Sequence, residues 1–208
     1  MKGYKGFSPE LHSVLGDHNP KNCSFRPGIT LEAENAKTAR EGYHFCEHPF
    51  GCLSYYSLDG KNRFFEIEAE GDIDEDANDR LACTKITLIR ELGLVEIAME
   101  EIKWLIGHPG LSGWERDYGG ARAGRDEAQC GQAQIAIARG KDPRCKGGVG
   151  AVLGFIKEDR KGTIISAKLY KVKDQEMAGR WLCLNDRREV VICEEAGDPG
   201  ASGAKGQS

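Results

Sequence analysis

The densest group of reactive side chains in the sequence lies between Gly42 and Tyr56. These fifteen residues include two histidines, two cysteines, a glutamate and a pair of adjacent tyrosines. Thiols and imidazoles are ligands that zinc prefers, and an imidazole can also serve as a general base. The residue types therefore raise two questions: whether the segment holds a metal and whether it forms a catalytic loop.

A zinc site in this segment would have to use His44, Cys46, His48 and Cys52. Their spacing, His-x-Cys-x-His-x3-Cys, does not match the paired ligands of a zinc finger or zinc ribbon. If residues 42–46 form a strand, His44 and Cys46 point to the same face, whereas Cys52 lies beyond a turn. We therefore predict that the segment binds no metal.

A catalytic site in this part of the sequence would use a histidine, a tyrosine and a glutamate. His44 could act as a general base or hold a ribose hydroxyl, and Tyr55 could stack on a flat ring. Glu66 or Glu68 could stabilise a positive charge that develops during a reaction. In the structural alternative, Phe45 belongs to the core, His44 borders a polar cleft and residues 49–56 form a helical turn. We favour the structural alternative, although the sequence leaves both open.

Length and composition indicate a chain that folds around its own core. It has 208 residues, of which 39% are hydrophobic, so disulfides or metals are not needed for stability. The first residues are not followed by an apolar run of signal-peptide length, and no stretch approaches the roughly 18 apolar residues that span a bilayer. We expect a cytoplasmic protein without membrane contact. In that compartment its eight cysteines are expected to be reduced.

Charge divides the sequence into two halves. Counting Lys, Arg, Asp and Glu gives a net charge of −7 for residues 1–107 and +3 for residues 108–208, which indicates two units. Within the second half, residues 116–146 carry seven basic and four acidic side chains and a single tyrosine. This excess of positive charge is modest for binding phosphates, so we do not expect nucleic acid as a partner.

Hydrophobic periodicity predicts an α+β domain with a mixed sheet over residues 1–107. In residues 63–70 apolar and acidic side chains alternate, as in a half-buried strand, and residues 82–89 are rich in β-branched residues. Apolar residues recur at helical spacing over residues 93–106, and Gly107-His-Pro-Gly110 then ends that helix.

An acidic run extends from Glu66 to Asp79 and contains eight acidic residues and no basic one. We favour a solvated strand face followed by an exposed loop, because such runs are common on surfaces. The alternative is a surface for a basic partner protein. The residues that would contact such a partner are Glu68, Glu70, Asp72, Asp74, Glu75 and Asp76.

The second half begins with segments in which small residues alternate with larger ones. Residues 108–148 are expected to form a short degenerate β-solenoid, in which only small side chains fit inside a turn, or else a Gly-rich linker. Short strands follow, and we predict a small antiparallel β domain over residues 149–195. The tail, residues 196–208, is rich in Gly and Ser and is expected to be disordered.

Several motifs resemble phage- and prophage-encoded proteins of uncharacterised function. In the first half these are Gly42-Tyr-His-Phe-Cys-Glu-His-Pro49, Arg63-Phe-Phe-Glu-Ile-Glu-Ala-Glu70 and Glu91-Leu-Gly-Leu94. In the second half, Cys145-Lys-Gly-Gly-Val-Gly150 and Trp181-Leu-Cys-Leu-Asn-Asp186 resemble the domain that follows Gly-Ala-Ser repeats in those proteins. The resemblance implies an accessory protein that acts in the host cytoplasm.

The first half also resembles the ADP-ribosyltransferase fold. Tyr4-Lys-Gly-Phe7, Gly42-Tyr-His-Phe45 and Tyr55 fall where that superfamily has its nicotinamide-binding motifs. The resemblance implies NAD as a cofactor. The residues that it implies for cofactor binding are Lys5, Gly6 and Phe45, and those that it implies for catalysis are His44, Tyr55 and Glu66. The sequence departs from the pattern because His44 replaces the usual tyrosine and Lys5 the usual Arg or His, and no later strand offers a matching glutamate.

Three functions from different classes follow from these observations. The first, which we favour, is a phage-encoded protein without a cofactor that binds and inhibits a host macromolecule, for example an anti-CRISPR inhibitor of host defence. The second is an ADP-ribosyltransferase-like enzyme that uses NAD. The third is a structural or assembly protein built on the Gly-rich solenoid. The sequence leaves the oligomeric state open, including a homodimer.

Overall fold

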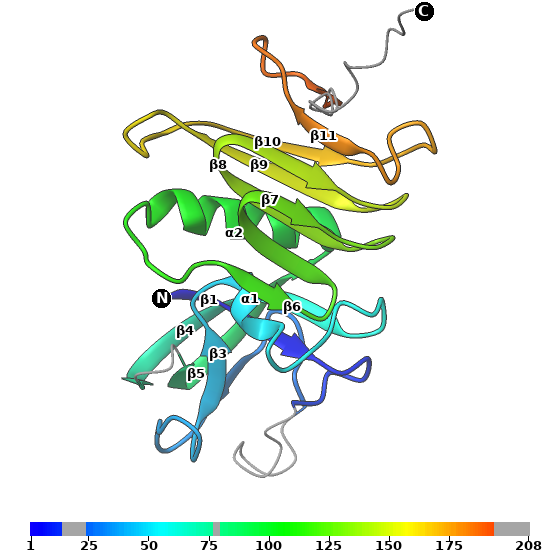
Figure 1. Cartoon of the computed structure of the whole chain (residues 1–208). Coiled ribbons are helices and arrows are strands. Elements are labelled where there is room, and N and C mark those ends of the chain that lie inside the picture. The colour runs from blue at the N-terminus through cyan, green and yellow to red at the C-terminus, as the bar shows by residue number, and fades with distance from the viewer. Residues whose placement is uncertain (14–23, 77–79, 194–208) are drawn as a thin grey trace, which may run out of the picture.

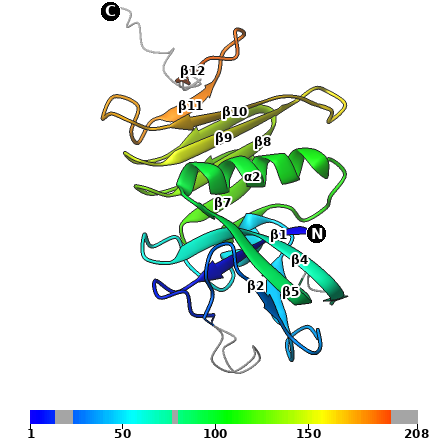
Figure 2. The same ribbon diagram turned by 180° about the vertical axis from the view of Figure 1, so that it is seen from behind.

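The structure is a computed structural model that describes residues 1–13, 24–76 and 80–193 (Figures 1 and 2). Within these residues the chain is mostly β, with two sheets and two helices. This arrangement agrees with the predicted α+β class in its broad sense. The tail for which disorder was predicted, residues 196–208, lies outside the described residues.

The first sheet closes on itself. Its strands are β1 (Lys2–Phe7), β2 (Thr30–Glu32), β3 (Tyr43–Cys46), β4 (Arg63–Glu75) and β5 (Arg80–Leu92). The strand order is β2-β5-β3-β1-β4, and β4 also pairs with β5, so that four strands form a closed ring. All its strand pairs are antiparallel, whereas a mixed sheet was predicted. The long hairpin of β4 and β5 explains part of this difference, because so short a connection joins only antiparallel strands.

The alternation in the strand that the sequence placed at residues 63–70 is confirmed. Phe65, Ile67 and Ala69 are buried, whereas Glu68 and Glu70 are exposed. The buried side chains of β4 belong to a core inside the ring, where the Phe65 ring meets the ring of Phe7 edge to face at 5.7 Å. The hydrophobic effect therefore fixes the register of this strand.

Helix α2 (Leu94–Gly107) lies between the two sheets, and the short helix α1 (Pro49–Cys52) follows β3 (Figure 2). The helix predicted at 93–106 is thus confirmed. Its buried face includes Ile97, Ile102 and Leu105, which share one core with side chains of both sheets. The second sheet approaches so closely that a Cβ at Gly154 would lie 2.8 Å from Ile102 Cδ1. Both sheets therefore pack against this one helix.

The second sheet has seven strands. They are β6 (Arg116–Tyr118), β7 (Ala121–Gln129), β8 (Ile135–Lys146), β9 (Val152–Glu158), β10 (Ile164–Lys171), β11 (Trp181–Leu184) and β12 (Val190–Ile192). The prediction of β-structure rather than helix in the Gly-rich segment is confirmed by β7 and β8. The boundary expected at residue 148 falls inside this sheet, because β8 pairs with both β9 and β11.

Small side chains allow β7, β8 and β9 to lie side by side in parallel. The register aligns Ala121 with Ile135 and Ile135 with Val152. Along β8, Ile135 and Ile137 belong to the core shared with α2, whereas Ala136 and Ala138 belong to a core on the opposite face. Both faces of this strand are therefore buried, which explains why its sequence does not alternate between apolar and polar residues.

Candidate functional site

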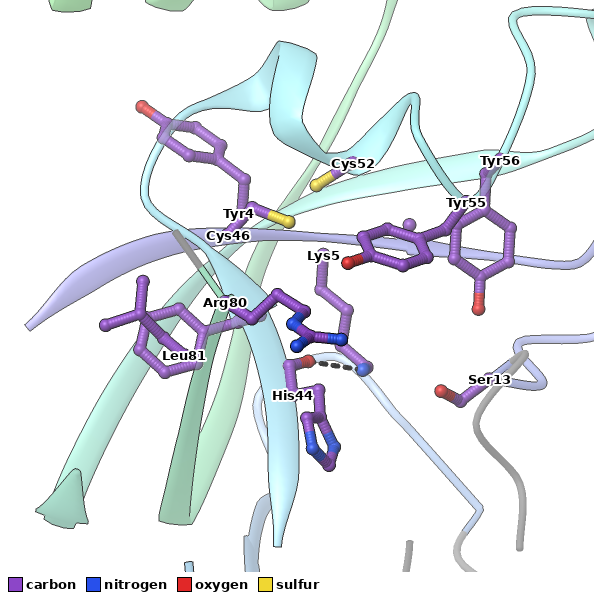
Figure 3. Close-up of a pocket in the computed structure, with 12 residues that line it drawn as sticks. Tyr4, Lys5, Ser13, His44, Cys46, Cys52, Tyr55, Tyr56, Arg80 and Leu81 are labelled. Carbon is purple, nitrogen blue, oxygen red and sulfur yellow. Dashed lines mark hydrogen bonds between the residues drawn. The ribbon is translucent and has the colours of Figure 1, made fainter. Parts of the chain in front are cut away.

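A pocket opens where β1 and β3 separate. These two strands pair at a single position, where Tyr4 faces Cys46, and the space beside that pair is not closed by further ladder hydrogen bonds. Figure 3 shows the side chains around it. The described residues that line the pocket are Tyr4, Lys5, Gly6, Ser13, His44, Phe45, Cys46, Cys52, Tyr55, Tyr56, Arg80 and Leu81.

The pocket brings together five of the six residues that the sequence singled out for catalysis or cofactor binding. These are Lys5, Gly6, His44, Phe45 and Tyr55. The sixth, Glu66, lies elsewhere. Its carboxylate is 2.7 Å from Arg90 and 3.4 Å from Lys2, in a cluster of charges on the side of the ring that faces α2.

The charged side chain of Lys5 lies in an almost closed space. The side chain is 5% exposed, and its ammonium donates a hydrogen bond to the backbone carbonyl oxygen of His44 (Figure 3). The rings of Phe7 and Phe25 lie 5.4 and 5.6 Å from the nitrogen. Because β1 and β3 do not pair at this point, the lysine bonds a strand carbonyl that the ladder leaves open. The hydrogen bond of the ammonium therefore links β1 to β3 beside the point where their pairing ends.

Two tyrosines form one wall of the pocket. Tyr56 is buried, and its ring covers β1 so closely that a Cβ at Gly6 would lie 2.5 Å from Tyr56 Cδ2. Tyr55 is 41% exposed, and its ring lies beside that of Tyr56 (Figure 3). Burial of the hydroxyl raises the pKa of Tyr55, so this tyrosine is neutral at physiological pH. Gly6 therefore serves packing, while Tyr55 is available to a ligand.

Sequence reasoning missed Arg80, which the pairing of β3 with β5 places opposite Cys46. Its guanidinium forms an ion pair with Asp76 at 2.5 Å and extends toward the same space as the Lys5 side chain (Figure 3). No motif could have identified this arginine, because its position depends on strand register. Among the described residues that line the pocket there are two cations, several aromatic rings and no carboxylate.

A polar groove adjoins the pocket on the side of α1. It is lined by Cys46, His48, Gly51, Ser54, Tyr55, Arg80, Arg116 and Tyr118. The Nδ1 atom of His48 lies 2.9 Å from the carboxylate of Glu101, which is buried on α2. The imidazole also stacks on Trp104 with ring centres 4.0 Å apart. Within the described ranges, no three His, Cys, Asp or Glu side chains are grouped as metal ligands.

The six acidic residues proposed for partner binding differ in their surroundings. Asp74 accepts hydrogen bonds from Lys37 and from Thr38, and Asp76 pairs with Arg80. The other four are exposed and form no ion pair with a described residue. They are Glu68, Glu70, Asp72 and Glu75.

Five basic side chains of the second half form ion pairs with acidic ones. Arg144 pairs with Glu127, Arg122 lies 3.8 Å from Asp117, and Lys157 lies 3.5 Å from Asp142. Arg139 is buried and lies 2.6 Å from Glu158. These pairs offset part of the positive charge in this half of the chain, and the absence of a nucleic-acid partner stays a prediction.

Residues 1–100 match a family model described as a domain of unknown function (DUF7666). No curated protein and no solved structure matches the chain. None of the helices in the part of the chain that the structure describes has the length and apolar character to cross a membrane.

Proposed function

We propose that the protein binds a small ligand, one that combines a flat ring with a negatively charged group, in the pocket between β1 and β3. The observation that carries this proposal is the presence of Lys5, Arg80 and Tyr55 around one largely apolar space. The two cations attract an anion, and the attraction is stronger in a pocket than in open water. The exposed Tyr55 ring offers a stacking surface for a planar group.

Arg80 is suited to the anionic part of such a ligand. It uses Nε and Nη2 for the carboxylate of Asp76, and a guanidinium has further N–H donors for a second acceptor. Phosphate and carboxylate groups match the geometry of these donors. Nucleotides, which join a flat base to phosphate, are therefore the ligand class that the lining favours.

NAD, the cofactor implied by the resemblance to ADP-ribosyltransferases, belongs to the same ligand class. We propose that the pocket binds such a ligand, and we do not propose that it catalyses ADP-ribosyl transfer. Transfer requires stabilisation of the positive charge that develops when the glycosidic bond breaks. Glu66, the candidate for this task, is engaged with Arg90 and Lys2 outside the pocket. The described lining offers no replacement carboxylate.

Thermal denaturation tests this proposal with NAD and AMP as the probes. A ligand that binds only the folded state raises the melting temperature. We expect both nucleotides to raise it, and Tyr55→Ala to remove the rise while the protein stays folded. Tyr170→Ala, a partly exposed tyrosine on β10, is the control that should keep the rise. No rise in the wild type, or an unchanged rise in Tyr55→Ala, would overturn the proposal.

A second candidate function, binding of a host partner protein, is supported by the acidic edge of β4. The pairing with β1 ends at Glu68, so no described strand pairs with this edge at residues 70–75. An open edge can accept an extended segment as an added strand, and the exposed Glu70, Asp72 and Glu75 would favour a basic one. The same charges also protect an edge from aggregation, so they are not specific to a partner.

The edge proposal is tested with a Lys- and Arg-rich peptide as the probe. Replacing Glu70, Asp72 and Glu75 with their amides should abolish binding measured by interferometry at physiological salt. Replacing the exposed acidic residues Asp174, Glu176 and Asp186 in the same way is the control that preserves the change in net charge. Equal loss in both variants would indicate unspecific attraction and contradict a site on β4.

We also propose that the Gly-rich segment predicted at residues 108–148 belongs to a short β-solenoid. It is supported by the parallel register, which advances 14 residues from Ala121 to Ile135 and 17 residues from there to Val152. In this proposal the turns form a scaffold against which α2, and through it the first sheet, is held. The assembly function that the sequence offered as a third alternative has no further support.

A further inference from the structure

We propose that Cys46 is a peroxide-reactive cysteine and that Cys52 converts its oxidised form into an intramolecular disulfide. This inference is independent of the proposed ligand, although both cysteines belong to the wall of the same pocket. It assigns a chemical activity to two thiols that were considered as zinc ligands from the sequence and predicted to bind no metal.

The two thiols are positioned for bond formation. Cys46 ends β3 and Cys52 ends α1, and Figure 3 shows their sulfur atoms facing each other. The thiols are in hydrogen-bond contact with one another. Two sulfurs in such contact need only a small movement to reach the S–S bond length of about 2.05 Å. The turn between the two residues can supply this movement without separating β3 from its neighbours.

His48 lies beside the reactive sulfur and is held by a buried carboxylate. A Cβ at Gly51 would lie 3.4 Å from Cys46 Sγ and 3.5 Å from His48 Nε2, so both atoms border the same small space. Because Nδ1 is engaged with Glu101, it is Nε2 that faces the thiol. Burial lowers the pKa of His48, but the Glu101 carboxylate outweighs it and leaves the pKa above its usual value.

The surroundings favour a thiolate at Cys46 rather than at Cys52. The hydrogen bond from Cys52 lowers the pKa of Cys46 against the effect of burial, and the charges of His48 and Lys5 lower it further. Burial and the contact with Cys46 raise the pKa of Cys52, and Glu101 adds to this. Thiolates are the nucleophilic form, so Cys46 is the attacking residue and Cys52 the resolving one.

The charged and titratable groups around Cys46 come from every element that packs against it. They are Tyr4 and Lys5 on β1, His44 on β3, His48, Tyr55 and Tyr56 beside α1, Arg80 on β5, Arg116 and Tyr118 on β6, and Glu101 on α2. Of these, Glu101 is engaged with His48 and with the backbone N–H of Phe50. The cationic side chains therefore dominate the space next to the sulfur.

Access limits the oxidant to a small molecule. Cys46 is 9% exposed, and it borders both the pocket and the polar groove that contains His48. A hydroperoxide is small and polar enough to enter the groove, whereas a bulky disulfide would have to displace the wall of the pocket. Hydrogen peroxide is therefore the oxidant class that fits.

The reaction proceeds in two steps that balance. The Cys46 thiolate attacks one peroxide oxygen, the O–O bond breaks, and the leaving hydroxide takes a proton to become water, which leaves a sulfenic acid on Cys46. The Cys52 sulfur then loses its proton and attacks the Cys46 sulfur. The S–O bond breaks and the hydroxide leaves with that proton as a second water. Two electrons pass from the two thiols to one peroxide.

Treatment of the whole protein with hydrogen peroxide, followed by peptide mapping, tests the proposal. We expect a disulfide between Cys46 and Cys52, and in Cys52→Ser a sulfenic acid at Cys46 that dimedone traps. The pair Cys183 and Cys193 is a reference, because its thiols are also in contact and the neighbouring cation is Arg144, whereas no histidine among the described residues contributes to that site. Burial raises the pKa of Cys193 to about 12. Oxidation there should be at least about tenfold slower, because that pair lacks the imidazole that lies beside Cys46.

The role of His48 is tested by the pH profile of Cys46 alkylation. His48→Gln should move the apparent pKa of Cys46 upward, whereas His108→Gln, which removes another histidine beside Trp104, should leave it unchanged. If His48→Gln does not fold, the wild-type profile decides, because the proposal requires an apparent pKa below about 8.5. An unlabelled Cys46 in folded Cys52→Ser, or equal oxidation of the reference pair, would overturn the proposal.

Discussion

Among the single residues of the pocket, Lys5 is buried although removing a charged group from water costs free energy. Lys5 places an ammonium among aromatic rings, a position that is tolerated because the charge meets a carbonyl oxygen and ring faces. Gly6 is needed for a different reason, since the ring of Tyr56 occupies the place of a side chain. In the motif Tyr4-Lys-Gly-Phe7, Lys5 therefore supplies a charged group to the pocket, whereas Gly6 leaves room for the ring of Tyr56.

The packing role of Gly6 gives the first prediction. Gly6→Ala should lower the free energy of unfolding by about 1–3 kcal/mol, because the added methyl group overlaps the buried ring of Tyr56. Gly107→Ala is the control, since a Cβ there meets no atom within 4 Å. Urea denaturation measures both. A Gly6→Ala variant as stable as the control would mean that Tyr56 does not occupy this position.

The pair of His48 and Glu101 gives a prediction for pH. Because the carboxylate raises the pKa of His48 above its ordinary value of 6.5, the charged pair stabilises the folded state fully below pH 6.5. That contribution is lost as the pH rises through the higher pKa of the folded protein. The difference in unfolding free energy between wild type and His48→Gln should therefore shrink from pH 6 to pH 9. A difference that grows with pH would contradict the pairing.

At the scale of secondary structure, the sequence predicted individual elements well and their partners poorly. The strand at 63–70 and the helix at 93–106 follow from local periodicity, which burial of one face imposes. The closure of the first sheet and the register of β3 against β5 depend on contacts far apart in the chain. Arg80 was missed for this reason.

The placement of Glu66 illustrates the same limit. In the pairing of β1 with β4, Glu66 lies opposite Tyr4, whose hydroxyl donates a hydrogen bond to Glu100 on α2. Neighbouring residues of a strand point to opposite faces, so Glu66 faces α2 while Lys5 faces the interior. The sequence order of the motifs could not supply this information, because it does not fix the pairing.

The two faces of β4 can be compared by substitution. Phe65→Ala should destabilise the protein by about 3–5 kcal/mol because it opens a cavity inside the ring, whereas Glu68→Ala should change stability by less than about 0.5 kcal/mol. Thermal melts of the two variants provide the measurement. Equal effects would place β4 in the opposite register.

At the scale of the whole molecule, one core joins the two halves that charge had separated. The cluster that contains Tyr4 of β1 and Ile137 of β8 also contains Leu105 of α2. Each sheet therefore buries part of its apolar side chains against the helix. The difference in net charge between residues 1–107 and 108–208 therefore describes the surface and not the packing.

Shared packing predicts a single cooperative transition on unfolding. Fluorescence of Trp104 and Trp114, which lie in or against the shared core, should change at the same urea concentration as the circular dichroism of the whole chain. Two separate transitions would show that the halves unfold independently.

The pocket between β1 and β3 is proposed to bind an anionic ligand with a flat ring. Calorimetric titration of AMP into the wild-type protein and into Lys5→Met tests this binding, because methionine retains an unbranched side chain of nearly the same length and removes the charge. We expect saturable binding by the wild type and none by a folded Lys5→Met variant. Absence of saturable heat with the wild type, or the same affinity in Lys5→Met, would contradict it.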